Sequence, residues 1–364
     1  MLPRIPPVAV RAAYRLQQAS FRYGLVSAHA ALRKLIDRRR RAPSGALTAL
    51  EESYQELLSR DLENVERGVY PASLLFQIPL GDYARTLPRF LLDLRRVYAR
   101  FRRGAYDDVP EDLDLRRYPA YFRRAFHWQT DGYLSRRSAD LYDLGVEFLF
   151  MGCADVMRRQ VIPPMARFAK SVKRRPLRIL DVGCGTGRTL SQIATALPDQ
   201  RYFGIDLSGF YVETAREHLA GTPDVNLVTE NAEKLPFRDE YFDIVTSVFV
   251  LHELPRKTRR NVLAEALRVL RPGGLLVIED SAQLSDAPDL AFFFEGFADD
   301  MHEPFYRDYV RDGLEALLAR TGFCKAETER CWLSKVVSAH KPRAPRARRE
   351  SARRAPSKKS RPGP

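Results

Sequence analysis

The stretch LDVGCGTG at residues 180–187 decides which fold this sequence predicts. It joins a short β-type run at 177–182 to a helix-type run that opens at Arg188. Gly183, Gly185 and Gly187 let the backbone turn tightly and let a ligand approach it, and the N-terminus of the next helix adds exposed N–H groups. Alone, this pattern is also compatible with a plain turn packed on a helix or with the pyrophosphate cradle of a dinucleotide-binding fold.

Outward from this turn, short β-type runs alternate with helix-type runs. Strands are expected at 177–182, 201–206, 225–230, 242–248 and 275–280, and helices at 188–197, 210–219 and 257–270. This alternation predicts an α/β fold with a doubly wound, mostly parallel sheet covered by helices on both faces. Ligands are expected beyond the carboxyl ends of the strands.

Polar motifs follow the ends of successive strands. Asp206 closes the second strand, NAEKLPF at 231–237 follows the third, and LRPGG at 270–274 leads into the fifth. An acid at the end of strand two can accept both hydroxyls of a ribose, and a polar side chain after strand three can reach an adenine edge. The main alternative is a nicotinamide enzyme, which predicts a third glycine three residues after the second. Here the third glycine follows the second by two residues, and Asp181 immediately precedes the loop.

With these motifs in this order, the chain resembles the class I S-adenosylmethionine-dependent methyltransferases. Within that class it is most similar to the type 11 domain, which also occurs in ubiquinone and menaquinone biosynthesis methyltransferases. The resemblance covers roughly residues 145–338 and rests on LDVGCGTG, FGIDLS at 203–208, NAEKLPF and LRPGG. It implies a Rossmann-like sheet of seven strands whose last strand, from 331–339, runs antiparallel. It also implies S-adenosyl-L-methionine as the cofactor.

The resemblance assigns the cofactor to residues of the motifs. They are Asp181, Gly183, Gly185, Gly187, Asp206, Asn231 and Ala232. The glycines would face the methionine part, Asp181 would bond the amino group directly or through water, and Asp206 the ribose. Asn231 and Ala232 would face the adenine. The family commonly has Asp at position 231, but an amide still supplies an acceptor for the adenine amino group, so binding is expected to survive.

Candidates for removing a proton from the acceptor stand after strands four and five. Methyl transfer from a sulfonium is downhill, so the protein must hold the nucleophile in line and, for a hydroxyl or amine, accept its proton. VLHEL at 250–254 puts His252 and Glu253 at the rim of the expected site, and His302 lies after strand five. We predict these three as catalytic residues. The alternative for His252 is a rim histidine that is hydrogen-bonded for structural reasons.

Two segments dense in aromatic and hydrogen-bonding groups are expected to line the acceptor pocket. Residues 281–309 are longer than a bare connection requires, and FHWQTDGY at 126–133 lacks helical periodicity. The residues predicted to bind the acceptor are His127, Tyr133, Glu303, Tyr306 and Tyr309. Otherwise these segments make satisfied polar contacts between the helical region and the sheet. Their aromatic content fits a small-molecule, lipid-like or quinone-like acceptor.

The net charge of +14 is concentrated at the two ends of the sequence. Residues 1–43 and residues 341–364 each carry +9, which leaves −4 for 44–340. An acidic body disfavours a phosphate backbone as partner. SVFVLH at 247–252 also lacks the Asn/Asp-Pro-Pro-aromatic and Pro-Cys motifs of DNA methyltransferases, so no specific nucleic acid is expected. Two other functions stay open, a non-catalytic cofactor-binding assembly or regulatory factor and an RNA-associated protein that acts through basic tails.

Composition divides the chain into four parts. They are a basic amphipathic segment at 1–43, a helical lead-in or cap domain at 44–170, the S-adenosylmethionine-binding methyltransferase domain at 171–340 and a disordered basic tail at 341–364. The first 36 residues lack Asp and Glu, and their spacing predicts one apolar helix face. That face comprises Tyr14, Phe21, Leu25, Leu32 and Leu35. The segment is a transit peptide, a membrane-surface helix or a helix packed on the protein.

The C-terminal tail has no side chain that could build a core. It contains no aromatic residue and no aliphatic residue larger than Ala, so burial cannot offset the entropy of ordering it. It is either a solubilising tail or a tether to an anionic membrane or RNA.

Cysteine usage and hydropathy bear on the compartment. The four cysteines form no C-x-x-C pair, which argues against a zinc ribbon or a secreted disulfide framework, and no metal site is expected. No apolar stretch reaches the 18 residues of a membrane span. A cytoplasmic protein, in solution or peripheral to a membrane, is expected, or an organellar one if residues 1–43 are a transit peptide.

Overall fold

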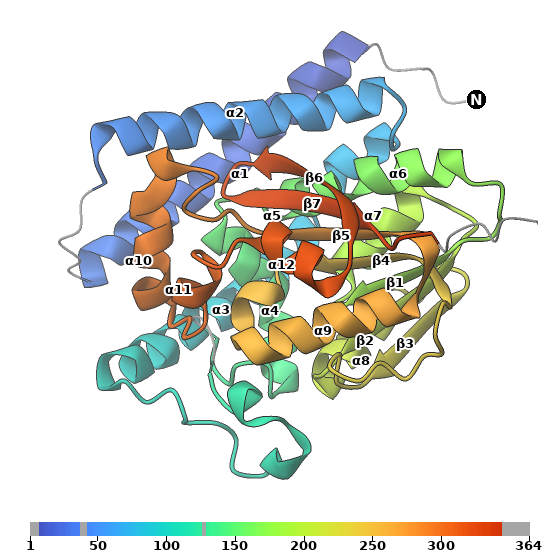
Figure 1. Cartoon of the computed structure of the whole chain (residues 1–364). Coiled ribbons are helices and arrows are strands. Elements are labelled where there is room, and N and C mark those ends of the chain that lie inside the picture. The colour runs from blue at the N-terminus through green and yellow to red at the C-terminus, as the bar shows by residue number, and fades with distance from the viewer. Residues whose placement is uncertain (1–6, 37–41, 126–128, 344–364) are drawn as a thin grey trace, which may run out of the picture.

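The sheet predicted from the turn at 180–187 is present and contains seven strands in the order β3-β2-β1-β4-β5-β7-β6 (Figure 1). The structure, a computed structural model, describes residues 7–36, 42–125 and 129–343. The strands are β1 Arg178–Val182, β2 Arg201–Asp206, β3 Val225–Thr229, β4 Phe242–Val248, β5 Leu270–Ser281, β6 Cys324–Cys331 and β7 Ser334–His340. β1 to β5 pair in parallel, and β7 runs antiparallel to β5 and β6. The predicted doubly wound, mostly parallel sheet is therefore confirmed.

The fifth strand begins five residues before its predicted start, because the LRPGG motif belongs to the strand. Leu270 already pairs with Phe242, and the register then shifts before Leu275 pairs with Ile244. The extra residues form a bulge, in which Gly273 adopts a φ of +79°. Sequence periodicity cannot reveal such a bulge, since Pro and Gly usually mark the end of a strand.

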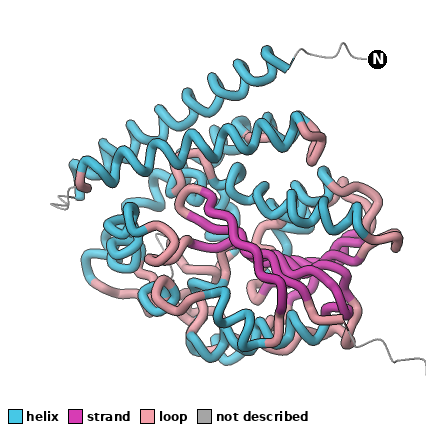
Figure 2. The backbone as a smooth tube through the Cα atoms, turned by 45° about the horizontal axis from the view of Figure 1, so that its top comes forward, coloured by secondary structure: helices cyan, strands magenta, loops and turns pink. Residues whose placement is uncertain are grey.

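Helices cover both faces of the sheet and extend beyond one of its edges (Figure 2). The α-helices are α1 Pro7–Ile36, α2 Ser44–Glu66, α3 Leu80–Arg103, α4 Arg136–Leu149, α5 Ala154–Arg158, α6 Ile162–Ser171, α7 Arg188–Ala196, α8 Gly209–His218, α9 Arg256–Val269, α10 Ala291–Met301, α11 Tyr306–Tyr309 and α12 Leu314–Thr321. The 3-10 turns are η1 Ala72–Phe76, η2 Leu115–Arg117, η3 Ala120–Phe122, η4 Arg159–Val161, η5 Leu251–Glu253 and η6 Pro288–Leu290. The helix α7 contacts both α8 and η4, and η4 contacts α6. The helix α9 packs on α12.

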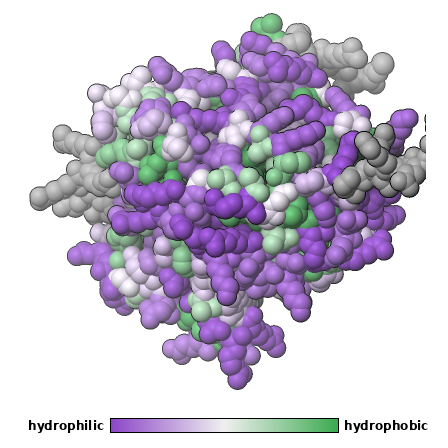
Figure 3. Space-filling view, in the orientation of Figure 1, coloured by the Kyte–Doolittle hydropathy of each residue, from purple (hydrophilic) through white to green (hydrophobic). Residues whose placement is uncertain are grey.

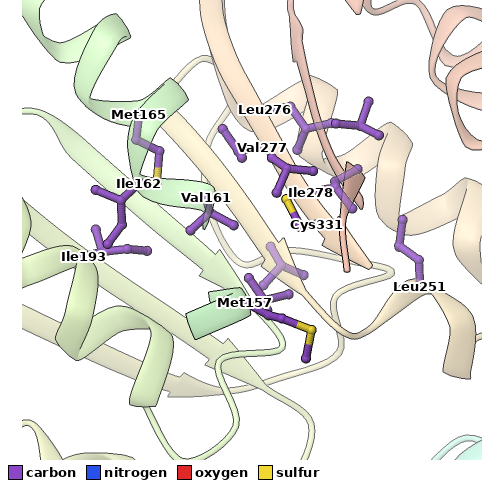
Figure 4. Close-up of a cluster of buried hydrophobic side chains, with 14 of the residues drawn as sticks. Met157, Val161, Ile162, Met165, Ile193, Leu251, Leu276, Val277, Ile278 and Cys331 are labelled. Atoms are coloured by element: carbon purple, nitrogen blue, oxygen red, sulfur yellow. The ribbon is translucent and has the colours of Figure 1, made fainter. Parts of the chain in front are cut away.

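The helical lead-in and the sheet share one hydrophobic core. Met157, Ile162 and Met165 from the lead-in pack together with Val277 of β5 and Ile193 of α7 (Figure 4). The same cluster of buried side chains extends from the first helix to the last strand. The lead-in therefore helps to fix the position of the sheet elements that surround the site.

The first helix packs on the protein through the face that its sequence predicts to be apolar. Tyr14 is fully buried, and its hydroxyl donates to the buried carboxylate of Asp61, which also accepts from Tyr70 and Arg159. The described part of α1 is packed on the protein, and the side chains of Leu32 and Leu35, at the other end of the predicted face, lie outside the described part of the structure.

The connection after β5 is helical, although its sequence predicts a long irregular segment. Residues 281–309 contain η6, α10 and α11, and Phe294 and Ala298 of α10 are buried one turn apart. A four-residue spacing places both side chains on one helix face, which explains why the segment packs as a helix.

The last described residues continue beyond β7 and pair with the bulge of β5. The Lys341 N–H donates to the carbonyl of Gly274, and the Gly273 N–H donates to the carbonyl of Lys341. The predicted boundary at 340/341 therefore falls inside a paired segment, and residues 344–364 lie outside the described part of the chain. Across the described helices, none is long and apolar enough to cross a membrane. The face seen in Figure 3 is mainly hydrophilic, with small apolar groups between charged residues.

Candidate active site

A cavity that opens to solvent lies at the carboxyl ends of β1, β2 and β4. It is lined by the glycine loop, by residues that follow β2 and β3, by aromatic residues and by Glu253. Among the predicted site residues, those that line it are Tyr133, Gly183, Gly185, Asp206, Asn231, Ala232 and Glu253. The sheet thus brings residues from distant parts of the sequence to one edge, as expected for an open α/β sheet.

The glycine loop lines the cavity through Gly183 and Gly185. Gly183, Gly185 and Gly187 all have positive φ values, which side chains other than glycine adopt at a cost. A methyl group at Gly183 would overlap Val250, whereas one at Gly185 would meet no atom within 4 Å. The loop at Gly185 therefore faces open space, which leaves room for a ligand to lie against the backbone.

Asp181 provides the clearest test of whether these residues fit the cofactor. Its side chain is 1% exposed, and neither carboxylate oxygen has a hydrogen-bond partner among the residues that the structure describes. Burial, reinforced by the nearby charge of Asp206, raises the pKa of Asp181 to about 7. A buried carboxylate without a partner is costly, and an ammonium group would compensate it. The amino group of S-adenosylmethionine fits this requirement.

Asp206 stands at the end of β2 with both oxygens turned toward backbone donors. One oxygen accepts from the Gly185 N–H at 2.9 Å and the other from the Ser208 N–H at 2.8 Å. Burial raises the pKa of Asp206 to about 6, although these two donors oppose the shift. Each carboxylate oxygen keeps further lone pairs, so the group can still accept the hydroxyls of a ribose.

Asn231 and Ala232 line the cavity after β3, where an adenine is expected. The Asn231 side-chain oxygen accepts from the Glu233 N–H at 2.8 Å, which fixes the turn. This use of the oxygen leaves one of its lone pairs and the amide donors for a ligand.

Aromatic rings from the lead-in and from α8 line the cavity. Tyr133, Tyr142 and Tyr211 pack edge to face with ring centroids 5.2–6.2 Å apart, and all three line the cavity. The Tyr133 hydroxyl donates to Glu253 at 2.6 Å. Its pKa lies well above the usual value because of burial and the Glu253 carboxylate, so it remains a donor at neutral pH.

His252 lies behind Glu253 and is held by Asp280 at the end of β5. Its Nδ1–H donates to Asp280 at 2.6 Å, and its Nε2 is 3.9 Å from Glu253 Oε1. Burial lowers the pKa of His252, but the Asp280 carboxylate, with the charges of Glu253 and Glu303, outweighs it and raises the pKa to about 8. His252 is 6% exposed and is not among the residues that line the cavity.

The other predicted residues after β5 lie outside the cavity wall. Tyr306 and Tyr309 are buried and present ring edges to His252, and both hydroxyls bond to Ser281. His302 ends α10 in a left-handed conformation and stacks on Tyr106.

Glu303 and His127 are the two remaining residues predicted to bind the acceptor. Glu303 is buried, and its charge contributes to the raised pKa values of His252 and Tyr133. His127 lies outside the described residues.

Two contacts anchor the glycine loop to the lead-in. The Thr186 hydroxyl donates to Asp143 of α4 at 2.7 Å, and Arg188 forms an ion pair with Asp155 of α5. Arg188 and Asp155 are largely buried. The conformation of the loop therefore depends on helices that precede the sheet.

Three residues in or next to the site were not predicted from the sequence. Asp280, Tyr142 and Tyr211 carry no motif, although Asp280 stands at a strand end, where the carboxyl-edge rule places ligand-binding groups. The tyrosines lie at helical spacing, which does not distinguish a core position from a cavity wall. In the part of the chain that the structure describes, no group of three or more His, Cys, Asp or Glu side chains is placed to hold a metal ion.

Part of this chain is similar to known methyltransferases. A family model described as a methyltransferase domain matches residues 179–274. The phthiotriol/phenolphthiotriol dimycocerosates methyltransferase 1 of Mycobacterium ulcerans is 37% identical over 133 residues, which cover 36% of this chain and 48% of that protein. The demethylmenaquinone methyltransferase of Symbiobacterium thermophilum is 38% identical over 120 residues, which cover 32% and 47% respectively. The chain thus spans about half the length of these two relatives.

Among solved structures, the chain is similar to an O-methyltransferase family protein from Burkholderia thailandensis. The two share 18% sequence identity with a TM-score of 0.45, and the match covers 57% of this chain and 61% of that one.

Proposed function

This chain contains a class I S-adenosylmethionine-dependent methyltransferase domain, and from that premise we propose that it is an enzyme that methylates a small, apolar acceptor of lipid or quinone type. The observation that carries the proposal is the continuity of the cavity. The open face of Gly185 and the carboxylate of Asp206 line the same cavity as the aromatic side chains and Glu253. The buried Asp181, which has no hydrogen-bond partner among the described residues, lies two residues before Gly183, which also lines the cavity.

Asp181 and Asp206 hold the cofactor, Asp181 at its amino group and Asp206 at its ribose. When bound, S-adenosylmethionine supplies a methyl group activated on a sulfonium sulfur. The tyrosine wall packs against an apolar or ring-bearing acceptor. Both relatives described above are named for lipid or quinone acceptors, which supports this class of acceptor.

Glu253 and His252 take the proton of an acceptor hydroxyl or amine. Glu253 faces the cavity and is oriented by the Tyr133 hydroxyl, and His252 Nε2 lies next to it. A proton that leaves the acceptor passes through Glu253 to His252 Nε2. The resulting imidazolium is stabilised by Asp280, which already accepts the Nδ1–H. His252 must be neutral to accept this proton.

Incubation of the full chain with methyl-labelled S-adenosylmethionine and total cell extract, fractionated into lipid, aqueous, RNA and protein pools, tests the proposal. We expect label in the lipid or aqueous pool, on a product that is one methylene heavier than its precursor, and a strong reduction with Glu253→Gln. Label confined to RNA or protein would overturn the class of acceptor. Tight cofactor binding without transfer to any pool would instead identify a non-catalytic cofactor-binding protein.

A further inference from the structure

The first helix has a second apolar face, which points away from the protein. The side chains of one stripe, at spacings of three and four residues, are all exposed: Val8, Ala12, Leu16, Ala19, Tyr23 and Val26. Leu16 and Tyr23 are 69% and 77% exposed. These spacings place the stripe on a single helix face, and its length from Val8 to Val26 is about 27 Å. We call these six residues the outer stripe.

The orientation of the outer stripe is fixed by the packing of the opposite face. Tyr14 anchors that face in the core, and two ion pairs to α2, Arg11 with Glu66 and Arg22 with Glu51, hold the flanks of the helix. Figure 2 shows α1 along the edge of the molecule beyond α2. The stripe is therefore presented to the outside by a rigid attachment to the body.

The net charge of the sequence segment that contains the outer stripe favours an anionic partner. Residues 1–43 carry +9, whereas residues 44–340 carry −4. Two of the basic side chains, Arg11 and Arg22, form ion pairs within the protein. The others are Arg15, which is exposed, and basic residues that precede and follow Arg15 in the sequence. An apolar stripe of this length beside net positive charge has the chemistry of a helix that lies in the interface of an anionic bilayer.

We propose that the outer stripe of α1 docks the protein on an anionic lipid surface, with the stripe inserted among the acyl chains and Arg15 at the headgroups. This docking is independent of methyl transfer. It uses the helix face opposite to the one that the sequence predicts to be apolar, because the predicted face packs on the protein core.

Sedimentation of the full chain with lipid vesicles tests the docking surface. Vesicles of phosphatidylcholine containing about one third phosphatidylserine are compared with vesicles of phosphatidylcholine alone. We expect binding to the anionic vesicles that weakens as the salt concentration rises. The double variant Leu16→Gln/Tyr23→Gln should weaken it at least about tenfold, because each substitution removes apolar surface from the acyl region.

The matched control is Leu87→Gln/Leu91→Gln on α3, another arginine-rich helix with exposed leucines. It should leave vesicle binding unchanged. All four side chains are exposed, so both variants should keep the parent melting temperature. Arg15→Gln supplies a milder second variant, with a smaller loss confined to anionic vesicles.

Three results would overturn the proposal. Equal binding of the parent and the α1 variant to anionic vesicles excludes the outer stripe, and a loss caused by the α3 variant alone moves the docking surface to α3. A parent dimer that dissociates in the α1 variant, measured by analytical ultracentrifugation without lipid, identifies the stripe as a subunit interface.

Discussion

At the scale of single residues, Asp181 couples cofactor binding to pH. Its pKa of about 7 in the ligand-free site means that it is mostly protonated at pH 6.5. An ammonium group placed beside it lowers that pKa, so binding at pH 6.5 should release a proton, and affinity should rise with pH until the amino group of the cofactor begins to lose its own proton. Calorimetry at pH 6.5 in buffers of different ionisation enthalpy measures the release. The amino group of the free cofactor, with a pKa near 7.7–8.0, is already protonated there.

Asp181→Asn provides the control for this measurement. The variant should lose most of the proton release and bind S-adenosylmethionine more weakly by about 1.5–3 kcal/mol, the range for a hydrogen bond to a charged group. Proton release that persists at the parent level in Asp181→Asn would place the titrating group elsewhere.

His252 should set the pH dependence of turnover. Its pKa is about 8 and it accepts a proton only when neutral, so kcat should rise with pH through about 8. Asp280→Asn removes the charge that raises this pKa and should shift the acidic limb to lower pH. His252→Gln should lower kcat by about 10²–10⁴ and abolish the limb, with cofactor affinity within a few-fold.

His340→Gln, at the end of β7 and away from the cavity, serves as the matched histidine control and should keep the parent profile. A parent pH profile in His252→Gln would contradict the role of His252 and leave Glu253 as the group that accepts the proton.

At the scale of elements, the glycine loop allows ligand contact to be separated from backbone strain. Gly185 and Gly68 both have positive φ, and a side chain at either would meet no atom within 4 Å. Gly185→Val and Gly68→Val should therefore lose similar stability, on the order of 1–3 kcal/mol. Only Gly185→Val should also lose the thermal stabilisation by S-adenosylmethionine. Normal stabilisation in that variant would show that the loop is only a turn.

The contact between α4 and the glycine loop should tune cofactor affinity. Thr186→Val removes the hydrogen bond to Asp143 with little change of shape, and we expect the cofactor to bind more weakly by about 0.5–1.5 kcal/mol. Thr328→Val removes a similar bond, from a threonine hydroxyl to Glu315, on β6. Titration calorimetry should show no change for that control. Equal affinities for parent and Thr186→Val would mean that the loop keeps its shape without α4.

The same elements show what the sequence could and could not predict about the site. Asp181, Asp206 and Asn231 lie in motifs at strand ends, where the topology of a parallel sheet determines which residues meet, so their placement follows from the pattern. Tyr142 reaches the site through helix packing. Asp280 reaches it through a hydrogen-bond partner 28 residues away in sequence. Neither kind of contact leaves a local signal in the sequence. His302 and Tyr306 lie in the same segment after β5. That segment is helical, and His302 stacks on Tyr106 instead of facing the site.

At the scale of the whole molecule, the C-terminal residues divide into a paired part and a tail. Deletion of 344–364 should leave the melting temperature and cofactor affinity unchanged, because that composition contributes no core. Deletion of 341–364 also removes the backbone bonds of Lys341 to Gly273 and Gly274 and the ammonium contact to the Leu270 carbonyl. It should cost about 1–3 kcal/mol, which chemical denaturation measures. Equal losses from both deletions would mean that the tail docks on the acidic body.

The overall architecture was predictable where hydrophobic periodicity is strong and local. The strands β2 and β4 match their predicted bounds, and β4 is buried along its whole length, as expected for a central parallel strand. The sharing of a core between the lead-in and the sheet was not predictable, since composition alone cannot show that Met157 and Val277 pack in one cluster. For α1, periodicity identified an apolar face but could not show that a second, outer face remains exposed.

The packing of the first helices on the last strands has a consequence for synthesis of the chain. The Trp332 indole donates to the carbonyl of Leu50, and Arg60 bonds to the carbonyl of Arg330. On the ribosome, α2 emerges long before this hairpin is translated, so the part of α2 that contacts the hairpin stays uncovered until then. Nascent chains arrested before residue 324 should therefore bind chaperones and be cleaved in α2 by protease. Chains released after residue 343 should be protected there, which makes translation of β6 and β7 the event that closes this part of the fold.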